Sequence, residues 1–116
     1  MEGIELLCFQ IISAAGSARS SYIEAIQKVK NGNIDEAKKS MKEGEKQFLK
    51  GHDVHNTLLQ QEASGEAIKS SILVMHAEDQ LMGAEMFQTI AKEFIDTNLK
   101  INDLEQKLNK VLSSKH

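Results

Sequence analysis

Proline and tryptophan are absent from this chain of 116 residues, which has one tyrosine, four phenylalanines and one cysteine. Without proline, neither a ring clash nor a missing backbone donor breaks a helix. With so few aromatic side chains, small and aliphatic residues must build the core, which suits packed helices. The content of 41% hydrophobic and 27% charged residues indicates one globular domain covering residues 1–116.

Arginine is nearly absent as well, because Arg19 is the only one, and the net charge is −3. Bidentate recognition of phosphates and guanines favours arginine, so we expect no nucleic-acid partner. The single cysteine, Cys8, excludes an intrachain disulfide and fits a reducing compartment; its apolar neighbours indicate a buried thiol. The first residues include the acidic Glu2 and Glu5, whereas a secretory signal begins with basic residues, so we expect no such signal. No apolar run reaches the ~18 residues of a membrane span. We therefore expect a cytoplasmic protein.

Apolar residues recur at steps of three and four along most of the chain, which is the period of an α-helix. The pattern predicts three helices, over residues 3–30, 34–63 and 66–112, and hence an all-α fold of antiparallel helices. Turn signals separate the helices at Asn31-Gly32 and at Ser64-Gly65.

The second helix carries two further local signals. Asn33 precedes it as the expected N-cap, and Glu36 occupies the capping-box position three residues later. Gly44 and Gly51 fall on its inward-facing stripe although each costs roughly 1 kcal/mol against alanine. We expect another helix to approach closely at both glycines.

The third helix shows two apolar stripes, roughly 90° apart at 100° per residue. A helix in a monomeric bundle needs one such stripe, so the second indicates another subunit. The alternative is a single wide apolar face. Beyond residue 96 one stripe remains, which is typical of a coiled-coil extension. The first stripe comprises Leu73, His76, Gln80, Gly83, Phe87, Ile90, Phe94, Thr97, Ile101, Leu104, Leu108 and Val111, and the second comprises Ile68, Ile72, Met75, Asp79, Met82 and Met86.

Asp79 interrupts the second stripe, between Met75 and Met82. A buried carboxylate is usually paired, protonated or bound to a cation, and no basic residue lies one turn away. If three copies pack this stripe around a threefold axis, three Asp79 carboxylates converge. They would then share protons or hold a hard cation such as Mg²⁺. The alternative is a partly exposed aspartate at the edge of the stripe.

His76 lies one turn before Gln80 and about 60° around the helix from Asp79. A helical histidine is more often a surface or core group than a catalyst, although imidazole can form covalent intermediates as a nucleophile. His52 and His55 have the spacing to share a metal ion, but a solvated helix face is the more common explanation. No glycine-rich phosphate loop or metalloprotease motif is present.

Two segments resemble a known family. "LVMHAEDQLM" (73–82), preceded by "GHDVHNTLLQQEASG" (51–65), is similar to the lactose/cellobiose class of enzyme IIA in the bacterial sugar phosphotransferase system. That family typically shows the pattern L-x-V/M-H-A-Q-D-H-L-M. The resemblance extends over nearly the whole chain, in length, helices and loop positions.

The resemblance implies an up-down-up three-helix bundle that assembles as a homotrimer. It implies that His76 accepts a phosphoryl group from the histidine-containing phosphocarrier protein and passes it to a cysteine of the IIB component, which works with the membrane component IIC. It further implies that three Asp79 side chains bind one metal ion, Mg²⁺, on the trimer axis. The expected activity is therefore that of a phosphotransferase component in the uptake of a lactose-, cellobiose- or chitobiose-type sugar.

Three positions depart from the family pattern. Glu78 and His55 stand where glutamine is usual, and Gln80 replaces a second histidine. A carboxylate at Glu78 would disfavour a phosphorylated His76 if it pointed toward it. Two other functions remain open from the sequence: a helical interaction module, since "NGNIDEAKK" resembles a turn between helical hairpins, and a structural coiled-coil subunit with His76 packed.

Overall fold

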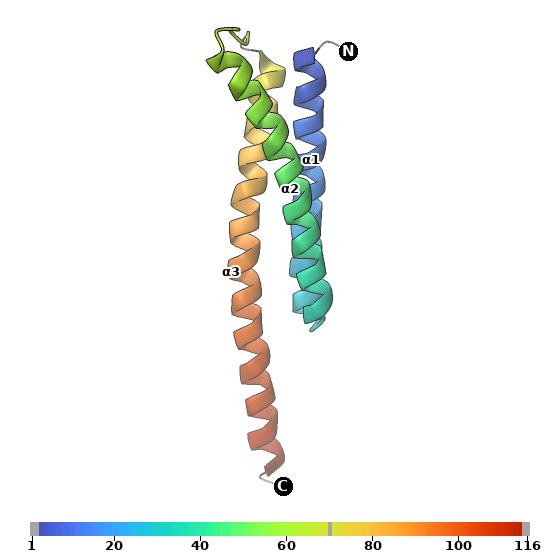
Figure 1. Cartoon of the computed structure of the whole chain (residues 1–116). Helices are drawn as coiled ribbons and strands as arrows, with labels where there is room; N and C mark the ends of the chain where they lie inside the picture. The colour runs from blue at the N-terminus through green and yellow to red at the C-terminus, as the bar shows by residue number, and fades with distance from the viewer. Residues whose placement is uncertain (1–2, 70, 115–116) are drawn as a thin grey trace.

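The computed structural model describes residues 3–69 and 71–114. It contains three helices, α1 (Gly3–Lys30), α2 (Ile34–Ala63) and α3 (Ile72–Ser114), and no strand among the described residues. The chain runs along α1, back along α2 and forward again along α3 (Figure 1). This confirms the predicted all-α, up-down-up bundle.

The first two helices end in the same way, with glycine in a left-handed conformation. After α1, Gly32 has a φ of 81°, and the next residue, Asn33, donates its N–H to the Lys28 carbonyl at 2.9 Å. After α2, Gly65 has a φ of 97°, and Glu66 donates its N–H to a carbonyl five residues back. These are Schellman motifs, in which glycine adopts positive φ without a steric penalty. Both predicted turns are confirmed.

The predicted capping box at the start of α2 is wrong. The Asn33 side chain makes no cap hydrogen bond, and Glu36 instead pairs with Lys39 at 3.4 Å. A capping box requires a free N–H on the N-cap residue. The Asn33 N–H is already bound to Lys28 in the Schellman motif, so Glu36 has no donor to accept from.

The third helix starts six residues later than predicted, at Ile72 instead of residue 66. Ser71 is its N-cap, because the Ser71 Oγ accepts a hydrogen bond from the Val74 N–H at 3.1 Å. Residues 66–69 are not helical, and residue 70 lies outside the described residues. Ile68 is therefore not on the helical stripe; it packs against the core from the loop.

The core lies where α1 faces both other helices. Tyr22, Ile11, Val29 and Cys8 of α1 are its largest fully buried side chains. On α2, Gly44 and Gly51 are buried, as expected for a close approach. A Cβ at Gly44 would lie 2.5 Å from Cε1 of Tyr22, so the glycine makes room for the ring.

The inward face of α3 is not either of the predicted stripes. Its buried residues are Ala77, Leu81, Ala84 and Ala91, a line beside the first stripe, on the side away from the second. Alanine adds little to a hydrophobic pattern, yet its small side chain lets helices approach closely. Leu73 and Phe87 of the first stripe are partly buried, whereas His76, Ile90 and Phe94 are exposed.

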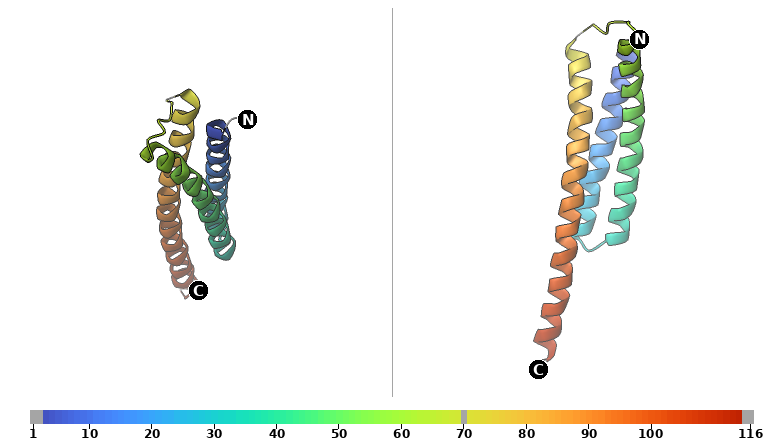
Figure 2. Two further views of the ribbon diagram at one scale, coloured as in Figure 1. Left: turned by 45° about the horizontal axis from the view of Figure 1, so that its top comes forward. Right: turned by 60° about the vertical axis from the view of Figure 1, so that its left-hand side comes forward.

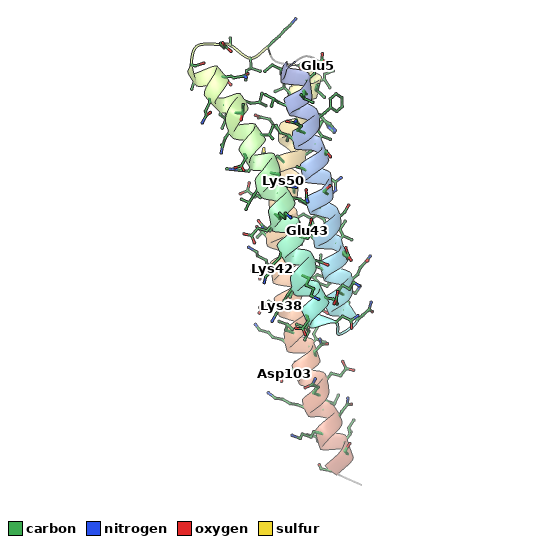
Figure 3. The ribbon with its side chains drawn as sticks, turned by 45° about the vertical axis from the view of Figure 1, so that its right-hand side comes forward. Glu5, Lys38, Lys42, Glu43, Lys50 and Asp103 are labelled. Atoms are coloured by element: carbon green, nitrogen blue, oxygen red, sulfur yellow. The ribbon has the colours of Figure 1, made fainter. Side chains whose placement is uncertain are left out.

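The third helix continues well beyond the hairpin of α1 and α2 (Figures 1 and 2). The described residues extend over 74 × 20 × 19 Å. Every residue from 103 to 114 is exposed, and Asp103 lies on this extension (Figure 3). No helix in the described part of the chain is long and apolar enough to cross a membrane.

Candidate functional site

The sequence motif around His76, residues 73–82, lies in the first three turns of α3. His76 is exposed, and its neighbour Ala77 is fully buried. At about 100° per residue, His76 and Glu78 lie on opposite flanks of the buried line. The contacts of the motif identify these flanks, because Gln80 reaches α1 and Glu78 reaches α2.

On the flank that carries His76, Arg19 of α1 donates a hydrogen bond from Nη1 to Oε1 of Gln80 at 2.9 Å. Gln80 is one turn beyond His76, which places the two side chains about 40° apart around the helix. Among the described residues Arg19 has no carboxylate partner. The bond therefore holds an unneutralised guanidinium near His76.

Sequence reasoning did not identify Arg19 as a site residue. Arg19 lies 61 positions before Gln80 in the chain, and only the packing of α1 on α3 brings them together. The one sign of its importance in the sequence was that Arg19 is the only arginine. Gln80, in turn, keeps its amide N–H₂ group to donate to a ligand.

On the opposite flank, Nε2 of His55 lies 2.8 Å from Oε1 of Glu78. The His55 side chain is 20% exposed and that of Glu78 is 46% exposed. The prediction that His52 and His55 lie on a solvated helix face is therefore wrong for His55, which is partly buried and hydrogen-bonded. Glu78 points toward α2, away from the flank of His76, so its carboxylate does not oppose a phosphoryl group on His76 of the same chain.

His52 and His55 are not brought together around a metal site. His52 is exposed, with its ring centroid 6.1 Å from that of Phe48. Both histidines line a pocket of about 170 Å³ together with Glu78 and Glu85. Within residues 3–69 and 71–114, no three histidine, cysteine, aspartate or glutamate side chains have the geometry to hold a metal ion.

Asp79 lies on the face of α3 that points away from the other helices. It is exposed, as are the apolar residues around it on the second stripe. Met82 and Met86 are each 65% exposed, and Ile72 is 86% exposed. A single chain thus leaves a nearly continuous apolar face uncovered, with one carboxylate in it. The four apolar residues of this outer face are Ile72, Met75, Met82 and Met86.

Cys8 is fully buried in the core beside Ile11 and Leu81. Burial raises the pKa of its thiol, and the nearby charge of Glu78 raises it further. Both effects disfavour the reactive thiolate. The structure thus agrees with a structural cysteine.

Residues 6–98 match the family described as "PTS system, Lactose/Cellobiose specific IIA subunit". The lichenan-specific phosphotransferase enzyme IIA component of Bacillus subtilis (strain 168) is 37% identical over 102 residues, which cover 88% of this chain and 93% of that protein. The lactose-specific EIIA component of Staphylococcus epidermidis is 34% identical over 80% of this chain and 89% of its own length.

The fold agrees with these sequence relationships. The crystal structure of the cellobiose-specific enzyme IIA from Bacillus anthracis superposes with a TM-score of 0.86 at 37% identity, covering 89% of this chain and 94% of the other. The matched region contains Arg19, His76, Asp79 and Gln80. The chain therefore belongs to the lactose/cellobiose-specific IIA family of the phosphotransferase system, as a sugar-specific IIA component.

Proposed function

We propose that this protein is a phosphoryl carrier with His76 as the phosphorylated residue. It accepts the group from the histidine-containing phosphocarrier protein and passes it to a cysteine of its IIB component, for uptake of a lactose-, cellobiose- or chitobiose-type sugar through IIC. The observation that carries the proposal is the exposed imidazole of His76, one turn from the Arg19–Gln80 pair, in a chain of this family. Family membership favours this function over a packing or interaction module.

The chemistry requires little of the chain itself. A ring nitrogen of neutral His76 attacks the phosphorus, the N–P bond of the donor histidine breaks, and the donor imidazole leaves. Positioning and charge stabilisation supply most of the catalysis in such transfers. The Arg19 guanidinium supplies positive charge, and the amide of Gln80 can donate to a phosphoryl oxygen. Exposure of His76 lets two different protein partners approach it in turn.

We further propose that the chain works as a homotrimer whose contact is the outer face of α3. Burying the exposed apolar side chains of this face is favourable, by about 25 cal/mol for each Å² of apolar surface removed from water. Around a threefold axis, the Asp79 side chains of three chains would converge. Carboxylate oxygens suit a hard cation, so three Asp79 side chains would hold one Mg²⁺, which would offset their mutual repulsion.

The carrier proposal is tested by incubating the protein with the general phosphocarrier proteins and phosphoenolpyruvate. Acid-labile phosphate should form on the native chain and be absent from His76→Ala and His76→Gln variants of native helicity. His52→Ala is the matched control and should be phosphorylated normally. Phosphate retained on His76→Ala would refute the assignment of the nucleophile.

The assembly proposal is tested by analytical ultracentrifugation with and without a chelator, at neutral and alkaline pH. The native chain should sediment as a trimer that is weakened by chelation and by high pH. Asp79→Leu should remain trimeric and lose both sensitivities, because leucine removes the repulsion. A native monomer at micromolar concentration would exclude the trimer; identical behaviour of native chain and variant would place Asp79 away from the axis.

A further inference from the structure

The only guanidinium of the chain is held close to the turn of α3 that carries His76. Nη1 of Arg19 donates a hydrogen bond to Oε1 of Gln80 at 2.9 Å. A guanidinium has several N–H donors, so this bond leaves most of them free for another acceptor. Long helical side chains lean toward the N-terminus of their helix, which brings the Gln80 amide, and the guanidinium bound to it, toward the turn of His76. The remaining donors of Arg19 thus lie near the side chain that is to be phosphorylated.

The flank of the bundle around the Arg19–Gln80 pair is open. Gly16 precedes Arg19 on α1 by about one turn, and Gly83 follows Gln80 on α3 by about one turn. A Cβ added at either glycine would meet no atom within 4 Å. The positions on both sides of the pair therefore leave room beside the guanidinium for a further group.

The charges on α3 cannot neutralise a phosphoryl group on His76. Such a group carries a charge of about −1.5 to −2 near pH 7. Residues 72–91 of α3 include three carboxylates and no lysine or arginine, and one of these carboxylates, Asp79, lies only about 60° around the helix from His76. The compensating cation must come from outside this segment. Arg19 of α1, which has no carboxylate partner among the described residues, supplies a positive charge on this flank.

We propose that Arg19 binds the phosphoryl group once it has been transferred to His76, and so joins α1 to α3 in the loaded carrier. This inference rests on the carrier function proposed above. The planar guanidinium can donate two parallel hydrogen bonds to two phosphoryl oxygens, while another N–H stays bonded to Gln80. Loading then adds a contact between the two helices that the empty carrier lacks, and partners meet a phosphoryl group whose charge is partly neutralised.

Binding by Arg19 affects the equilibrium of transfer as well as its rate. The transfer breaks the N–P bond of the donor histidine and forms an N–P bond to His76, so one phosphohistidine is exchanged for another. The position of the equilibrium therefore depends on the surroundings of the phosphoryl group in each protein. A charge-assisted contact that exists only in the phosphorylated chain draws the group onto this chain.

The first experiment measures the equilibrium constant for phosphoryl exchange between the histidine-containing phosphocarrier protein and the full chain. Arg19→Gln should lower it by about tenfold, and Arg19→Lys, which keeps the charge, should lower it less. The matched control is Lys28→Gln, because Lys28 lies on the same helix about 180° around from Arg19; its constant should equal that of the native chain. An unchanged constant in folded Arg19→Gln would overturn the proposal. Equal losses in Arg19→Gln and Lys28→Gln would also overturn it, since the effect would then be one of net charge.

Direct contact is tested by NMR on the isotope-labelled full chain. Because the sequence has a single arginine, the arginine Nε–H signal belongs to Arg19. Phosphorylation by phosphoenolpyruvate and the unlabelled general phosphocarrier proteins should shift this signal and slow the exchange of the guanidinium protons with water. His76→Gln in the same mixture should show neither change. An unshifted Arg19 signal in a chain that carries phosphate on His76 would overturn this inference alone, whereas a chain that takes up no phosphate would refute the carrier function on which it rests.

Discussion

His55 and Glu78 are paired across α2 and α3, with Nε2 of the histidine 2.8 Å from Oε1 of the glutamate. Both residues stand where the family pattern has glutamine. The two departures are therefore in contact in the structure, as one hydrogen-bonding pair between α2 and α3. Since α2 and α3 touch each other less than either touches α1, this bond is one of few direct links between them.

We predict that His55 and Glu78 are energetically coupled. In a double-mutant cycle of His55→Ala and Glu78→Ala, the coupling free energy should be about 0.5–1 kcal/mol, because the pair is partly solvated. Urea unfolding at one fixed protein concentration measures it. A cycle with His52→Ala in place of His55→Ala is the control and should show no coupling. The His55→Gln, Glu78→Gln double variant should recover most of the stability, since two amides also bond to each other.

Arg19 should matter for the rate of phosphorylation more than for stability. Arg19→Ala removes positive charge and leaves Gln80 unoriented, so phosphorylation of His76 should slow by about tenfold or more. Arg19→Lys should be intermediate, because lysine keeps the charge but not the planar fork. The measurement is the initial rate of phosphohistidine formation, with unfolding of the same variants in urea. An unchanged rate in folded Arg19→Ala would show that the guanidinium does not serve the transfer.

Gly44 should not tolerate alanine although it lies within a helix. Alanine gains about 1 kcal/mol in helix propensity, but its Cβ would lie 2.5 Å from Cε1 and 2.7 Å from Cδ1 of Tyr22. The buried ring must shift, so we expect a net loss of about 1–3 kcal/mol in unfolding free energy. Gly16→Ala is the matched control, because a Cβ at Gly16 meets no atom within 4 Å; this variant should be as stable as the native chain or more so. Gain of stability in Gly44→Ala would contradict the packing of α2 on Tyr22.

Tyr22 should make the protein sensitive to alkali. Burial, with a smaller contribution from the charge of Glu45, raises the pKa of Tyr22 to about 12 from an ordinary value of 10.0. The folded state holds the proton more tightly than the unfolded state. This contribution to stability is complete below pH 10 and is lost as the pH rises toward 12.

The variant Tyr22→Phe removes this titration. Within the described residues the Tyr22 hydroxyl is buried without a hydrogen-bond partner, so its loss should cost little at neutral pH. Between pH 10 and 12, thermal unfolding should show a smaller decline in stability for Tyr22→Phe than for the native chain. Parallel declines would mean that the hydroxyl is accessible to water.

The sequence determined the helices and the location of the motif. Steps of three and four specified all three helices, and the glycines at residues 32 and 65 specified where the first two end, because these signals are local in the chain. The motif around His76 is local too, and it sufficed to indicate the family. The predicted start of α3 was wrong because Ile68 continues the apolar period by chance. The hydrogen bond from the Val74 N–H to Ser71 decides where the helix begins.

Only the tertiary structure decided which side chains meet. Arg19 reaches Gln80, and His55 reaches Glu78, across gaps of 61 and 23 positions, which no periodicity within one helix encodes. The buried line of α3 was also a tertiary result, since Ala77 and Ala84 are small and contribute little to a hydrophobic pattern. Helix formation depends on neighbours in sequence, whereas the rotation of each helix is set by how closely side chains from different helices can pack.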